Sequence, residues 1–140
     1  MVRKLPSFTG ALLAAVSVML ASGGCSAACE TRAEKYSVTV MKATENSFRE
    51  EWGASYSELS GCDSWDSPSV TIWFADNIRS SVEVAERMKM DRWESVSQKD
   101  AVPYDADFVL KKDFEDQVLV AAIRDSPGGG EKEVEVLAGD

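Results

Sequence analysis

Carboxylates are the only candidate acid–base groups for catalysis in this sequence, because histidine is absent. The lack of histidine excludes Ser–His–Asp and Cys–His nucleophiles and every zinc site that uses imidazole. Two carboxylates held about 5–10 Å apart across a cleft could still hydrolyse a glycosidic bond. The acids in question are Asp63, Asp66, Asp105 and Asp107. Aspartate is also a common turn residue, and so short a chain leaves little room for a substrate groove. We therefore interpret them as turn-forming acids and expect no enzymatic activity.

Three further acids, Asp113, Glu115 and Asp116, crowd one predicted turn. Carboxylate oxygens suit calcium, so a weak surface calcium site at this turn is the alternative to a solvated turn. The EF-hand pattern D-x-[DN]-x-[DN]-G is absent from all of these acidic clusters, and so are the P-loop, G-x-S-x-G and G-x-G-x-x-G motifs. We expect no metal and no cofactor.

The charge balance excludes one class of partner. The chain of 140 residues holds 15 Lys and Arg against 24 Asp and Glu, a formal charge of −9. A nucleic-acid-binding protein needs a basic surface, so nucleic acid is not an expected partner. An acidic body is instead attracted to basic partners.

The N-terminus has the three parts of an export signal. Arg3 and Lys4 supply a positive start, residues 11–21 form an uncharged apolar run, and small residues lead to Cys25. The run is shorter than the roughly 20 residues that a membrane span needs, which favours a cleaved signal over an anchor helix. The sequence therefore predicts export, with residues 1–24 removed.

The motif Ser22-Gly23-Gly24-Cys25 resembles the lipobox of bacterial lipoproteins, with Ser22 where that family usually has leucine. The resemblance implies that Cys25 carries a diacylglycerol thioether and becomes the first residue, anchored on the extracytoplasmic face of the cell membrane. Ordinary signal peptidase offers a second cut, since Ser26-Ala27-Ala28 follows the A-x-A-like rule and would release a soluble secreted protein.

Both cuts leave the same two cysteines to pair. If Cys25 is lipidated, or is lost with a cut after Ala28, Cys29 and Cys62 remain. Exported proteins fold in oxidising surroundings, so we predict a Cys29–Cys62 disulfide.

That disulfide requires the chain to reverse between its ends. Aromatic and apolar residues recur every four positions from Tyr36 to Tyr56, as in one long helix. A helix from Cys29 to Cys62 would hold its ends about 50 Å apart, whereas a disulfide needs Cα atoms within roughly 7 Å. We place the break near residues 44–46 and a helix at about 47–59. Before the break, residues 35–42 could be a β-branched strand or the first helix of a hairpin.

The rest of the chain has clearer patterns. Alternation predicts a strand over 69–75, and the capping box of Ser80 and Glu83 predicts a helix over 81–92, which Trp93 closes. Short turns force the last strands to pair antiparallel. These last strands are expected over residues 106–112, 117–124 and 131–138.

These elements predict an α+β fold: an antiparallel sheet of about four strands, three of them a C-terminal meander, with two helices on one face. Residues 25–34 would form a lipid-proximal tether and residues 35–140 a single domain. A helix, a tryptophan and a β-meander in a small exported chain also resemble actinobacterial exported lipoproteins of unknown function.

A binding surface is the remaining functional feature. Trp65 lies in a polar loop between Asp63 and Asp66, and a tryptophan in such a place can anchor an interface; the alternative is that its ring folds back beside the disulfide. Cutting before Cys25 would leave 13 basic side chains against 24 acidic ones, a charge of −11. We expect a lipid-anchored, non-catalytic module that binds a protein or cell-wall partner. The alternative is a soluble secreted acidic inhibitor, or immunity-type factor, for a basic enzyme.

Overall fold

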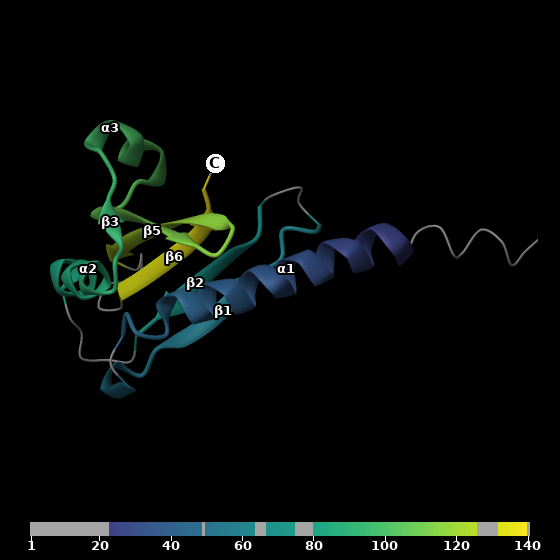
Figure 1. Ribbon diagram of the computed structural model, residues 1–140, viewed down its shortest axis with the longest axis horizontal. Helices are drawn as coiled ribbons and strands as arrows, with labels where there is room; N and C mark the ends of the chain where they lie inside the picture. The colour runs from purple at the N-terminus through teal and green to yellow at the C-terminus, as the bar shows by residue number, and fades with distance from the viewer. Residues whose placement is uncertain (1–22, 49, 64–66, 75–79, 126–131, 140) are drawn as a thin grey trace, which may run out of the picture.

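A computed structural model describes residues 23–48, 50–63, 67–74, 80–125 and 132–139. Within these residues the fold is α+β, with an open antiparallel sheet of six strands and three α-helices (Figure 1). The helices are α1 (Gly23–Thr44), α2 (Ser81–Met90) and α3 (Gln98–Ala101), with 3₁₀ turns η1 (Glu50–Trp52) and η2 (Val102–Tyr104). The strands are β1 (Ser55–Leu59), β2 (Ser69–Trp73), β3 (Glu94–Ser95), β4 (Phe108–Phe114), β5 (Gln117–Asp125) and β6 (Lys132–Ala138).

The strands are ordered β1-β2-β6-β5-β4-β3, and every neighbouring pair is antiparallel. The predicted meander β4-β5-β6 is therefore present, and β2 extends it beside β6. Two strands were not predicted, β1 and the two-residue β3, so the sheet has six strands where about four were expected. The strand predicted over 69–75 ends at Trp73 within the described residues.

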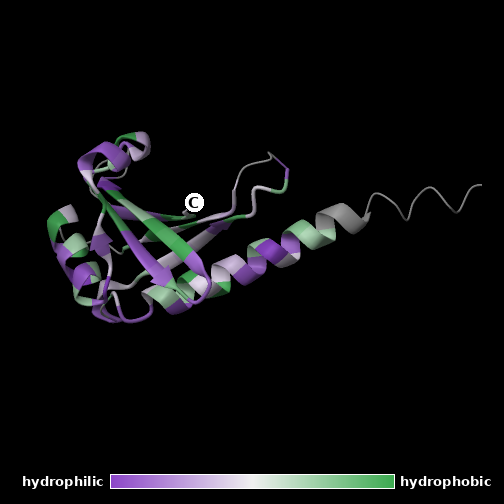
Figure 2. Cartoon of the chain, turned by 45° about the horizontal axis from the view of Figure 1, so that its top comes forward, coloured by the Kyte–Doolittle hydropathy of each residue, from purple (hydrophilic) through white to green (hydrophobic). Residues whose placement is uncertain are grey.

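Cross-strand register shows which face of the sheet holds the core. One row of directly paired residues crosses five strands and joins Tyr56, Ile72, Val134, Ile123 and Phe108. Its three central members are fully buried. α1 and α2 cover this face, since their buried side chains belong to the same core. Figure 2 shows apolar stretches in the central strands and hydrophilic residues along the N-terminal part of α1.

α2 begins as predicted. The Ser80 side chain accepts a hydrogen bond from the backbone N–H of Glu83, which satisfies one of the free amides at the helix start. Trp93 follows α2 and lies in the core, where it is only 2% exposed. The buried face of α2 includes Val84, Ala85 and Met88, whereas Val82 is 54% exposed.

The first third of the chain decides between the two alternatives for residues 35–42. Residues 35–42 belong to α1, because Tyr36, Val40 and Ala43 fall on one helical face and all reach the core. The β-branched residues there therefore do not form the strand alternative. Residues 25–34, expected to be a tether, also lie in α1.

The helix predicted at 47–59 is wrong. The chain turns after Thr44, makes the short η1 and passes through Gly53, whose φ of 57° suits glycine. It then returns as strand β1, in which Tyr56 pairs with Ile72 and packs against the core. The reversal that the disulfide required is thus made by a helix followed by a strand.

Candidate functional site

The N-terminal part of α1 stands out from the domain. We call residues 23–32 the neck, because Ala33 is the first buried side chain of α1 among those that the structure describes, from residue 27 onward. The neck extends away from the sheet in Figure 1. From Ala27 to Arg32 every side chain is exposed except the partly exposed Cys29. The neck therefore contributes little to the core.

The predicted disulfide fastens this neck to the domain. Cys29 is bonded to Cys62, with Cα atoms 5.9 Å apart and a sequence separation of 33. Cys62 lies just after β1, so the bond joins the neck to the loop that connects β1 and β2. Cys25 lies one turn further toward the N-terminus in α1, and its side chain is outside the described residues.

The predicted interface residues are only partly described. Asp63 is exposed directly after the disulfide. Trp65 and Asp66 lie outside the described residues. Two further tryptophans differ in their surroundings: Trp52 is 7% exposed in the core, whereas Trp73 is partly exposed on the face of the sheet opposite the core.

The other candidate acids occupy opposite ends of β4. Asp105 and Asp107 precede the strand, whereas Glu115 and Asp116 form the hairpin turn after it. Glu115 has a φ of 55°, a conformation that side chains other than Gly, Asn and Asp rarely adopt. No cluster of three metal-ligating side chains occurs among the described residues.

Asp105 and Asp107 line the acidic pocket, a hollow of about 470 Å³ at one end of the sheet. The residues that line the pocket are Asp105, Ala106, Asp107, Arg124, Asp125 and Glu133. Most of these carboxylates have partners. The Ser81 hydroxyl, in the first turn of α2, lies 2.8 Å from Asp107 Oδ2 and 3.3 Å from Asp125 Oδ1.

Two basic side chains balance the acids of this pocket. Arg124 Nε lies 2.7 Å from Glu133 Oε1, and its Nη2 pairs with Glu135 two residues further along β6. Lys132 pairs with Asp125. The hydrogen bond from the Lys132 ammonium lowers the pKa of Asp125 below its ordinary 3.8; partial desolvation opposes this shift, and the Lys132 charge and the Ser81 hydroxyl add to it.

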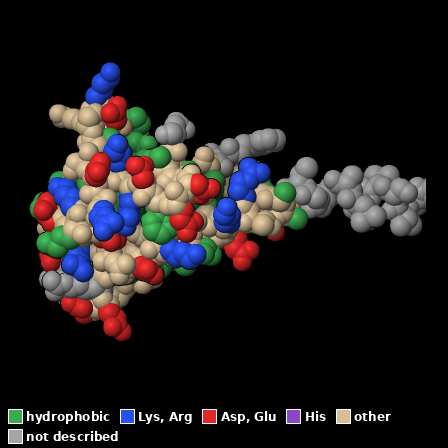
Figure 3. Space-filling view, in the orientation of Figure 1, with side chains coloured by type: hydrophobic (Ala, Val, Ile, Leu, Met, Phe, Trp, Pro, Cys, Tyr) green, Lys and Arg blue, Asp and Glu red, His purple; other side chains and the backbone are tan. Residues whose placement is uncertain are grey.

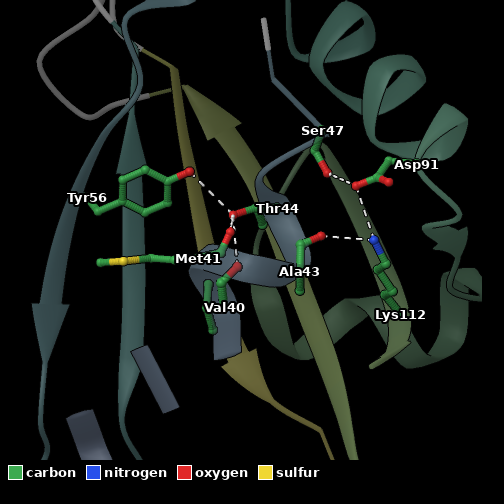
Figure 4. Close-up of polar contacts among 8 residues, drawn as sticks. All are labelled: Val40, Met41, Ala43, Thr44, Ser47, Tyr56, Asp91 and Lys112. Atoms are coloured by element: carbon green, nitrogen blue, oxygen red, sulfur yellow. Dashed lines mark hydrogen bonds and ion pairs between the residues drawn. The ribbon is translucent and has the colours of Figure 1, made fainter. Parts of the chain in front are cut away.

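A second polar cluster joins the ends of both long helices to the sheet (Figure 4). Lys112 Nζ, on β4, donates to the carbonyl of Ala43 at 2.9 Å and to Asp91 Oδ2 at 3.1 Å. The Ser47 hydroxyl donates to the same Asp91 oxygen at 2.6 Å. A cation is favoured at a helix C-terminus, so the Lys112 ammonium stabilises the C-terminal end of α1. It also neutralises the charge of the Asp91 carboxylate at the end of α2.

Sequence reasoning missed the basic members of both clusters, Arg124 and Lys112. Each lies on a strand with an ordinary alternating pattern, and each meets its partners only through strand register or helix packing. Asp63 is not among the pocket residues, so the structure does not bring the four candidate catalytic acids together.

No family model, curated protein or solved structure matches this chain. Within the described residues, no helix is both long enough and apolar enough to span a bilayer.

Proposed function

We propose that this chain is an exported protein, held on the extracytoplasmic face of the cell membrane by a lipid on Cys25, and that its α+β domain is a non-catalytic binding module. The observation that carries the proposal is the geometry of the neck. It is a helix fastened by the Cys29–Cys62 disulfide, and it places Cys25 at the end that points away from the domain.

The disulfide supports export. Disulfides persist in oxidising compartments outside the cytosol and are rare within it. Closing a loop of this length stabilises a domain by about 3–4 kcal/mol, a large part of the net stability of so small a protein. Such a bond suits a protein that lives outside the cytosol.

The neck supports an anchor with a defined spacing. A lipid on Cys25 would lie eight residues before Ala33, which is buried against the domain. At 1.5 Å per residue this is about 12 Å of helix. The domain would stand clear of the lipid head groups and leave its sheet free for a partner.

The acidic pocket supports a binding role over a hydrolytic one. Hydrolysis by a pair of carboxyl groups needs one of them to act as a general acid, with a pKa raised so that it holds its proton near neutral pH. Here Asp107 is held by Ser81, Asp125 by Lys132, and Glu133 by Arg124. These pairs tie strands and helix together, and the pKa of Asp125 is lowered, not raised.

The test is to express the full chain in a bacterium that processes lipoproteins and to measure the intact mass of the membrane-bound product. We expect a chain that begins at Cys25 and carries a diacylglycerol group. The Cys25→Ser variant should keep the precursor mass, and Ser22→Leu should increase the processed fraction.

Two outcomes would overturn the anchor. A soluble product that begins at Cys29 would indicate the cut after Ala28 and favour the secreted inhibitor. An uncleaved chain with free thiols at Cys29 and Cys62 would indicate a protein that is never exported.

A further inference from the structure

The outward face of α1 carries its charges in two separate rows. The buried side of this helix is formed by Tyr36, Val40 and Ala43. On the opposite side Val38 is 46% exposed, and Met41, one turn further, is 36% exposed. Exposed side chains of both signs surround them, and Figure 3 shows acidic and basic groups at the surface along the N-terminal part of α1.

Helical spacing separates these charges by sign. Glu30 and Glu34, four residues apart, lie to one side of Val38. Lys35 and Lys42, seven residues apart, lie to the other side. All four are exposed, and none makes an ion pair with another described residue. Glu30 and Glu34 repel each other in the single helix.

We infer that this face of α1 pairs with the same face of a second copy of this chain, with the two helices parallel and Val38 at the contact. A two-fold axis along parallel helices sets the acidic row of each copy against the basic row of the other. An antiparallel pair would set acid against acid. Glu30 and Lys35 are five residues apart, the spacing of the charges that pair between the strands of a parallel coiled coil.

Parallel pairing also suits chains anchored in one membrane. This step rests on the proposed function, because lipids on two Cys25 residues would point both necks at the same bilayer. Val38 and Met41, on one turn of α1, can bury far less surface than the roughly 1,200 Å² of a stable interface. The pair should therefore be weak in solution and form when anchoring raises the local concentration.

The experiment holds the domain on vesicles without its natural lipid. The chain from residue 25 onward, with Cys25→Ser and an N-terminal hexahistidine, is bound to vesicles that contain a nickel-chelating lipid. Val38→Cys is compared with Val82→Cys, a matched control on α2 that is 54% exposed. Mild oxidation should give a covalent dimer of Val38→Cys on vesicles, and much less for Val82→Cys or for either variant in solution.

Orientation is tested with cysteines away from the centre of the contact. Thr31→Cys should cross-link to itself if the helices are parallel. Cross-links between Thr31→Cys and Glu45→Cys, with neither linking to itself, would show an antiparallel pair and overturn the inference.

Charge reversal tests the recognition itself. In the Val38→Cys background, Lys35→Glu alone and Glu30→Lys alone should each lower the dimer yield about two- to fivefold per altered contact. A mixture of the two variants restores opposite charges at both contacts and should restore the yield. Reversal at Lys89, on α2, is the control and should change nothing. Thermal unfolding of each variant confirms that it folds.

The results separate the inference from the proposed function. Equal cross-linking of Val38→Cys and Val82→Cys on vesicles would overturn the pairing and leave the lipid anchor untouched. A chain that lacks lipid in cells but forms the Val38→Cys dimer on vesicles would keep the pairing surface and refute the anchor.

Discussion

Lys112 and Asp91 form an ion pair of 3.1 Å that ties β4 to the C-terminal end of α2. Both side chains are largely buried, at 11% and 20% exposed. The ammonium also lies 5.7 Å from the Trp93 ring centre and 5.8 Å from that of Phe114. Together with the carbonyl of Ala43, these contacts make Lys112 the point where both long helices are fixed to the sheet.

Replacing this lysine should therefore destabilise the domain. Lys112→Met leaves Asp91 buried without its cation, which we expect to lower the free energy of unfolding by about 2–4 kcal/mol. Lys111→Met is the matched control, since Lys111 is exposed on the other face of the same strand, and it should change stability by less than about 0.5 kcal/mol. Urea denaturation measures both. Equal effects of the two substitutions would contradict the role of Lys112.

Loss of the disulfide should weaken the fold and loosen the neck more than the core. Replacing Cys29 and Cys62 together by serine should lower the free energy of unfolding by about 3–4 kcal/mol. Amide exchange in residues 27–32 should become faster even in native conditions, because few core contacts hold that segment. Cys25→Ser serves as the control and should leave both measurements unchanged. Unaltered exchange in the neck would show that other contacts hold it.

The Asp125–Lys132 ion pair predicts that the folded domain loses part of its stability at acid pH. The lowered pKa of Asp125 in the folded state means that the unfolded chain takes up its proton first as the pH falls. The stabilisation is therefore complete above the ordinary pKa of 3.8 and is lost as the pH falls through the lower folded value. When the free energy of unfolding is measured as a function of pH, Lys132→Met should abolish this loss of stability in acid, and Asp125→Asn should do the same. Asp113→Asn, at the other end of the sheet, is the comparison that should retain it.

Tyr36 predicts that the domain also loses stability at high pH. Burial, with a smaller contribution from the charge of Glu135, raises the pKa of the Tyr36 phenol above its ordinary 10.0. The unfolded chain then loses this proton first, so stability falls as the pH rises above 10.0. Tyr36→Phe should reduce that fall.

Tyr36→Phe should also be neutral or stabilising at pH 7, because the buried hydroxyl has no hydrogen-bond partner within the described part of the chain. Tyr56→Phe provides the contrast, since the Tyr56 hydroxyl lies 3.4 Å from Thr44 Oγ1. That substitution should cost about 0.5–1.5 kcal/mol. A larger loss from Tyr36→Phe than from Tyr56→Phe would contradict this reading of the core.

The elements that the sequence predicted well have local causes. The capping serine at position 80 marks the start of α2, and alternation around Ile72 marks β2. The short turn at Glu115 forces β4 and β5 to pair. The Cys29–Cys62 pairing was also predictable, because both possible cuts leave the same two thiols, and it required the chain to reverse.

The elements that were missed depend on distant partners. β1 carries mostly polar, exposed side chains, so it has no alternation to detect and becomes a strand only by pairing with β2. β3 has two residues and depends on β4. In the candidate site, Arg124 meets Glu133 directly across the strands and Glu135 two residues further on, a relation that exists only once the register of β5 and β6 is known.

The position of β6 in the sheet has a consequence for the export that we propose. This strand is the last one described, yet it lies between β2 and β5 in the middle of the sheet. Until residues 132–138 have been synthesised, the sheet consists of two separate halves that no strand joins. In the export that we propose, a chain that crosses a membrane from its N-terminus could not close this sheet until residues 132–138 had crossed.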